Sequence, residues 1–153
     1  MTHAAVWEEF RPQLEKPAAS QWISVKHLDA APWVFDALNK IAALSDLAPN
    51  WDGYGSPRID SRAIASARRF VASVAFDSLP APHIVPVLGG SVGLHWHCGS
   101  RELEFTFQPD GALEFLKVLG PDLDREESME EGTLRHETET GGLKLLLWMV
   151  GAR

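Results

Sequence analysis

Two histidines and two glutamates form the group of side chains with the clearest chemical potential in this sequence of 153 residues. His95 and His97 are two residues apart in an alternating stretch, so on a β-strand both side chains point to one face. Glu102 and Glu104 have the same spacing on the next predicted strand, within cross-strand reach. Because imidazole and carboxylate groups bind zinc and iron, the pattern raises the hypothesis of a small metal-dependent hydrolase using His95, His97 and Glu104.

A polar sheet face explains the same four residues without a ligand. Histidines two residues apart are common on exposed strands, where they pair with glutamates across the ladder. Cys98 follows His97 directly, and neighbouring residues on a strand point to opposite faces, which excludes a Cys–His nucleophile pair. We therefore favour the polar face, and we predict no catalytic residue, no bound metal and no cofactor.

The densest turn signal in the chain is Asn50-Trp51-Asp52-Gly53-Tyr54-Gly55. Its glycines permit positive φ, and the carboxylate of Asp52 can accept hydrogen bonds from nearby amides, as in an Asx turn or a helix cap. We expect Trp51 to be mostly buried and to hold this loop to the neighbouring helices. The alternative is a partner-binding loop that presents Asp52 and Tyr54, because binding residues often lie on loops of rigid scaffolds.

This turn and the segments after it share an order of features. A helical pattern follows at residues 61–76, a proline-rich extended piece at 79–87, a Gly-Gly strand at 89–97 and a Leu-Glu-x-Glu-like strand at 103–107. Together they resemble an uncharacterised group of small bacterial proteins, although Phe105 and Thr106 replace an expected aliphatic and an expected acidic residue. The resemblance covers the middle third to half of the chain. It implies an architecture and supplies no mechanism.

Hydrophobic periodicity predicts an α+β fold. Apolar residues recur at helical spacing over residues 32–47 and 61–76, which predicts two helices packed as a hairpin. Alternation over residues 84–118 predicts an antiparallel meander of three or four strands, with the helices on one face. We expect residues 143–150 to form a C-terminal helix, with a buried strand as the alternative. The sheet residues expected to face the helices are Val92, Leu94, Trp96, Leu103, Phe105 and Phe107.

The remaining segments carry weaker patterns. The pattern of residues 1–28 predicts a peripheral segment with a short helix and a short strand. Residues 120–139 are acidic and poor in large apolar side chains, which predicts a solvated loop, with a short strand at 132–135 as the alternative. We expect the whole chain, residues 1–153, to form a single domain.

The composition limits which classes of partner and which cellular compartment fit this chain. The formal charge of −7 argues against nucleic-acid or anionic-membrane binding and is compatible with a basic protein partner. The single cysteine fits a reducing compartment, and neither a signal peptide nor a membrane-spanning run is visible, so we expect a cytoplasmic protein.

Small size, acidity, six tryptophans and the lack of a complete catalytic constellation favour a non-enzymatic bacterial protein-binding module. An antitoxin, an immunity protein or a phage-defence accessory protein would fit, and the sequence leaves the oligomeric state open. The residues expected to contact the partner are Trp51, Asp52, Tyr54, His95, His97, Glu102 and Glu104.

Overall fold

The computed structural model describes residues 31–74, 78–135 and 138–151. The chain divides into two units, residues 1–32 and 33–153, and every described helix and strand belongs to the second unit. The helix and the strand predicted within residues 1–28 lie outside the described residues. The expectation of a single domain over the whole chain stays a prediction.

Two helices begin the second unit. Helix α3 spans Trp33–Ala43 and continues into a short 3-10 turn, η1, at Leu44–Asp46. Helix α4 spans Ser61–Ser73 and begins where the side chain of Asp60 accepts a hydrogen bond of 2.8 Å from the backbone N–H of Arg62, which satisfies a free amide of the first turn. The two helices pack against each other, so both helices and their hairpin arrangement are confirmed.

Five antiparallel strands follow as a meander in which each strand pairs with the next along the chain. Four of the strands occupy the segment predicted to hold three or four, and the fifth lies beyond it. The strands are β1 at His83–Val87, β2 at Ser91–Cys98, β3 at Arg101–Phe107, β4 at Leu113–Leu119 and β5 at Ser128–Leu134.

Strand β5 corrects the prediction of a solvated loop over residues 120–139. Residues 128–134 of that stretch pair with β4 along the whole length of β5. The acidic side chains are compatible with a strand because this is the last strand of the sheet and most of its residues remain exposed. The backbone ladder, and not side-chain burial, therefore holds β5 in place.

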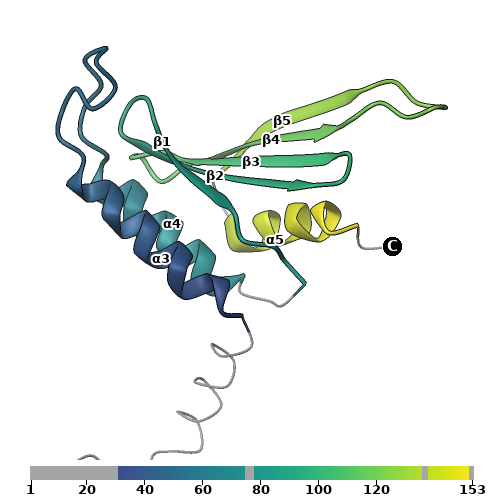
Figure 1. Ribbon diagram of the computed structural model, residues 1–153, viewed down its shortest axis with the longest axis horizontal. Coiled ribbons are helices and arrows are strands. Elements are labelled where there is room, and N and C mark those ends of the chain that lie inside the picture. Colours follow the sequence, from purple (N-terminus) through teal and green to yellow (C-terminus); the bar gives the residue numbers. More distant parts are fainter. Residues whose placement is uncertain (1–30, 75–77, 136–137, 152–153) are drawn as a thin grey trace, which may run out of the picture. The chain divides into compact units, whose positions relative to one another are not determined.

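The C-terminal segment is a helix, as predicted. Helix α5 spans Thr138–Met149 and contacts β2 and β3. The three helices lie on the same side of the sheet, with α3 and α4 side by side and α5 beneath the strands (Figure 1). We call the side of the sheet that carries the helices the helix face, and the opposite side the open face. No helix among the described residues is long and apolar enough to cross a membrane.

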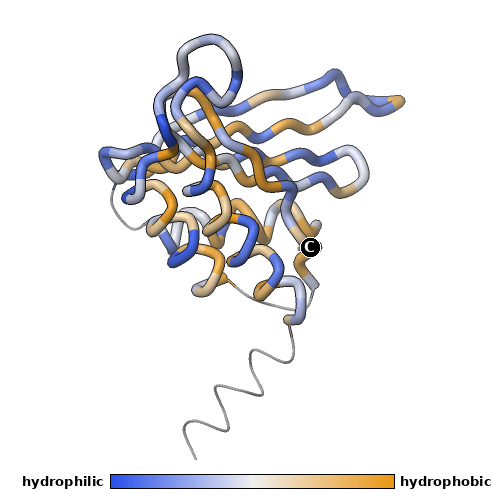
Figure 2. The backbone as a smooth tube through the Cα atoms, turned by 60° about the vertical axis from the view of Figure 1, so that its left-hand side comes forward, coloured by the Kyte–Doolittle hydropathy of each residue, from blue (hydrophilic) through white to orange (hydrophobic). Residues whose placement is uncertain are grey.

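The hydrophobic core fills the helix face of the sheet. Apolar and polar residues alternate along the strands (Figure 2), which directs one set toward the helices and the other toward solvent. All six residues predicted to face the helices are buried. The ring of Phe70 in α4 lies 5.3 Å from that of Phe105 in an edge-on arrangement and 5.5 Å from that of Phe107. Trp96 meets Phe105 at 5.7 Å, and its indole N–H donates to the backbone oxygen of Pro80.

Helix α5 approaches this aromatic cluster through a glycine. A Cβ atom added to Gly142 would lie 2.4 Å from Cε2 of Phe70, a distance that carbon atoms do not tolerate. The neighbouring Gly141 faces only the ends of the Leu134 side chain, at 2.9 Å from Cδ1. Gly142 is therefore needed for the close packing of α5 on α4, whereas Gly141 borders a side chain that can move.

We predict that Gly142→Ala lowers the free energy of unfolding by about 1–3 kcal/mol, because the methyl group overpacks a buried ring. Gly141→Ala is the matched control on the same helix. Alanine is a better helix former than glycine by about 1 kcal/mol, so this variant should be neutral or more stable. Urea unfolding of both variants measures the difference, and equal effects would contradict the assigned contact between α4 and α5.

Candidate functional site

The loop between η1 and α4 carries three of the predicted partner-binding residues. We call residues 50–56 the Tyr54 loop. One oxygen of Asp52, Oδ1, accepts hydrogen bonds from the backbone N–H groups of Tyr54 at 2.9 Å and Ser56 at 3.3 Å. The other, Oδ2, accepts a bond of 2.6 Å from the hydroxyl of Ser56, which is buried. The predicted role of Asp52 as an internal fastener of this turn is confirmed.

Asn50 closes the same loop from its first position. Its side-chain Oδ1 accepts a bond of 2.6 Å from the N–H of Gly55, and its own N–H donates to the backbone oxygen of Ser56 at 2.7 Å. Its carbonyl accepts a further bond from the N–H of Gly53 at 3.1 Å. Asn50 holds a φ of 63°, which asparagine tolerates better than most residues. These contacts fix the two ends of the loop together.

Trp51 is mostly buried, as predicted, but it is not one of the fully buried residues of the core. The indole N–H donates to the backbone oxygen of Pro57 at 3.1 Å. Trp51 therefore ties the Tyr54 loop to the residues that lead into α4, and it leaves part of its ring in solvent.

Tyr54 stands at the tip of the loop with 92% of its surface exposed. Its neighbours Gly53 and Gly55 have φ of 78° and 86°, a conformation that glycine adopts without steric cost. Within the described residues no side chain packs over the Tyr54 ring and its hydroxyl makes no hydrogen bond. Hydrogen bonds to its backbone thus fix the loop, and its one fully exposed large side chain is the aromatic ring of Tyr54.

The open face of the sheet holds the histidines and the glutamates in two separate pairs. His95 is opposite Glu104, with 4.0 Å between Nε2 and Oε2, and His97 is opposite Glu102, with 3.2 Å between Nδ1 and Oε1. The predicted cross-strand proximity is confirmed. No group of three His, Cys, Asp or Glu side chains among the described residues is arranged to hold a metal ion. The metal-dependent hydrolase stays a hypothesis that the sequence raised.

The structure separates the predicted contact residues into two surfaces. The Tyr54 loop joins the sheet beyond its end, where the N–H of Asp60 donates to the oxygen of Gly90 at 2.9 Å. Gly90 directly precedes β2, whereas His97 lies near the opposite end of that strand. Seven residues of extended chain span about 24 Å. The Tyr54 loop and the His97–Glu102 pair therefore cannot be parts of one small-molecule site.

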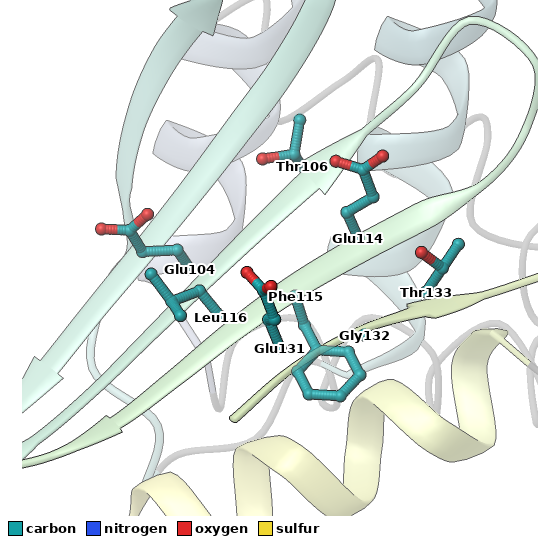
Figure 3. Close-up of a pocket in the computed structure, with 8 residues that line it drawn as sticks. All are labelled: Glu104, Thr106, Glu114, Phe115, Leu116, Glu131, Gly132 and Thr133. Carbon is teal, nitrogen blue, oxygen red and sulfur yellow. The ribbon is translucent and has the colours of Figure 1, made fainter. Parts of the chain in front are cut away.

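A hollow of about 410 Å³ on the open face was not predicted from the sequence. Figure 3 shows the carboxylates of Glu104, Glu114 and Glu131 on one side of the strands, whereas the ring of Phe115 points away, toward the side of α5. Thr106 and Thr133 flank Glu114 across the two ladders. Glu114 and Glu131 escaped sequence reasoning because their proximity depends on the pairing of β4 with β5, and β5 had been interpreted as a loop.

Compared with known proteins, the chain matches no family model, no curated protein and no solved structure. The resemblance of its central part to the group of small bacterial proteins stays a prediction. The site is therefore interpreted from its own geometry.

We predict a pH-dependent contribution of Asp52 to stability. The hydrogen bond from the Ser56 hydroxyl, and then that from the Tyr54 amide, hold the pKa of Asp52 below its ordinary value of 3.8. A lowered native pKa means that the contribution is complete above pH 3.8 and is lost as the pH falls through the native pKa. Asp52→Asn should be less stable than the wild type at neutral pH, and the difference should shrink in acid.

Urea unfolding at a series of pH values measures this difference. Ser56→Ala removes the strongest of the contacts, so in this background the effect of Asp52→Asn should be smaller. Equal stability of the wild type and Asp52→Asn at neutral pH would contradict the fastening role.

We predict that the double variant His95→Gln, His97→Gln folds with a free energy of unfolding within about 1 kcal/mol of the wild type, since both rings lie on a polar, solvent-facing surface. Equimolar zinc should leave the melting temperature of the wild type unchanged. A rise in the wild type that the double variant lacks would restore the metal hypothesis.

Proposed function

We propose that this chain is a non-enzymatic protein-binding module whose main contact is Tyr54. The observation that carries the proposal is the combination of a ring that is 92% exposed with a loop whose backbone is fixed by internal hydrogen bonds. Fastenings of this type also occur in loops that only connect two helices, so the proposal rests on their combination with a large aromatic side chain at the tip.

A fixed loop and a tyrosine suit recognition for two physical reasons. Tyrosine buries a large area on binding and has few rotatable bonds, and it is enriched among residues that dominate binding energy. A loop that is already held in one conformation loses little further entropy when a partner docks, which strengthens binding. The Tyr54 loop combines both properties.

Asp52 supports this contact indirectly. Both of its oxygens already accept hydrogen bonds within the loop, so its role in the proposal is to position Tyr54 and not to meet a basic group of the partner. Trp51 supports it as well, because its indole N–H holds the loop to Pro57. The partner surface that suits the Tyr54 loop is therefore a pocket that accepts an aromatic ring.

The biological setting that fits best is a small bacterial binding protein, such as an antitoxin, an immunity protein or a phage-defence accessory protein. The supports are the resemblance of the central part, the small size and the net charge of −7, which favours a basic partner. We expect such a protein to act by occupying a surface of its partner.

We predict that a photo-crosslinking amino acid at position 54 gives a discrete crosslinked species in an extract of the source cells. Leu123 is the matched control, because it is also a large side chain at a turn and is 99% exposed. The same probe at position 123 should not give that species. Asp52→Ala should reduce the yield at position 54, since the loop then loses its fastening. Equal crosslinking at positions 54 and 123 would contradict the proposal.

A further inference from the structure

The second surface of interest is the free edge of the sheet at β5. Among the described residues only β4 pairs with β5. The other edge strand, β1, is five residues long and contains Pro86, which cannot donate to a ladder. β5 has seven residues and no proline. An edge of this kind is a template for an added strand unless it is protected.

Hydrogen bonds at the two ends of β4 identify the backbone groups at this edge. The N–H of Gly120 donates to the oxygen of Ser100, and the N–H of Gln108 donates to the oxygen of Ala112. Residues in an antiparallel strand bond alternately to one neighbour and to the other. Every second residue of β4 from Ala112 to Gly120 therefore bonds to β3, and the residues between them bond to β5. In the register of β4 and β5, this leaves three residues of β5 whose backbone N–H and C=O groups point away from β4: Met129, Glu131 and Thr133.

The side chains of these three residues lie on the open face. Glu131 is opposite Leu116 and Thr133 is opposite Glu114, so both share the face that carries the hollow. A strand added beside β5 would place every second side chain on this face, next to Glu131. The hollow then lies within reach of a long side chain, and it offers the carboxylates of Glu104, Glu114 and Glu131.

We propose that β5 accepts an extended segment of a partner protein that carries lysine or arginine at alternate positions. Backbone hydrogen bonds to the edge would supply affinity, and the acidic hollow would select the basic side chains. A second copy of this chain fits less well, because an antiparallel pairing of two β5 strands sets Glu130 and Glu131 close to their own counterparts. Like charges in such positions are destabilising.

This surface is distinct from the proposed contact at Tyr54. The probe that tests it is a capped ten-residue peptide with lysine alternating with threonine and valine, labelled for fluorescence anisotropy with the full-length protein. The wild type should bind this peptide, and binding should weaken as salt rises. The same peptide with glutamate in place of lysine should not bind.

Two variants test the two parts of the surface. Glu131→Lys should weaken binding of the lysine peptide by about tenfold or more, since it sets like charges side by side. Asp46→Lys, which makes the same change of net charge on the exposed end of η1, should have little effect. Thr133→Pro removes an outward N–H without changing charge, and it should also abolish binding while the protein stays folded.

Circular dichroism checks the fold of each variant, and Glu131→Lys decides the question if Thr133→Pro does not fold. If Glu131→Lys and Asp46→Lys lowered the affinity for the peptide equally, net charge alone would explain the binding, and the proposal would be overturned. Binding that Thr133→Pro leaves intact would also overturn it, as would a dimer of the wild type that Thr133→Pro dissociates. Tyr54→Ala should bind the peptide normally, so failure of this surface and failure of the Tyr54 contact can be told apart.

Discussion

Phe70 projects from α4 into the space that the sheet and α5 share. Its ring packs edge-on with Phe105 of β3 and at a tilt with Phe107 of the same strand. Gly142, which has no side chain, lies against the same ring. One side chain thus sets the distance between α4 and the sheet, and also that between α4 and α5. Because interiors are packed as densely as organic crystals, a change at this point shifts both layers at once. The place of β3 relative to α4 and α5 follows from the packing around this ring, whereas the last strand follows from its backbone pairing with β4.

The Tyr54 loop depends much less on that core. Its fastenings run between Asn50, Asp52 and Ser56, with the indole of Trp51 bonded to Pro57. Among the described residues, the backbone bond to the sheet nearest to this loop is that from Asp60, the N-cap of α4, to Gly90. The loop can therefore change in sequence at its tip without a change in the packing of the helices. A scaffold with that separation suits recognition, since the contact residue and the residues that hold it carry different constraints.

The sequence predicted those parts of the structure whose causes are local or periodic. The two helices, the strands β2 and β3 and the helix at α5 follow from spacing of apolar residues, and the role of Asp52 follows from turn chemistry within four residues. β5 was predicted only in part, by the alternative of a short strand at 132–135, because Glu130, Glu131 and Gly132 lack the alternation of a half-buried strand and the order of β5 comes from pairing with β4. The hollow shares that origin. The partner of the Trp51 indole N–H, the backbone oxygen of Pro57, could not be predicted, because size and apolar character indicate burial and not the acceptor.

The two borders of the sheet are unlike. Proline in β1 interrupts the donors on one side, while on the other side no strand among the described residues pairs with the outer edge of β5. A sheet that could extend in both directions could propagate from molecule to molecule into a fibril. Here Pro86 removes a donor at the β1 edge, so two copies of this chain that paired through β5 would not extend further through β1. The asymmetry of the two edges therefore opposes growth of the sheet from molecule to molecule.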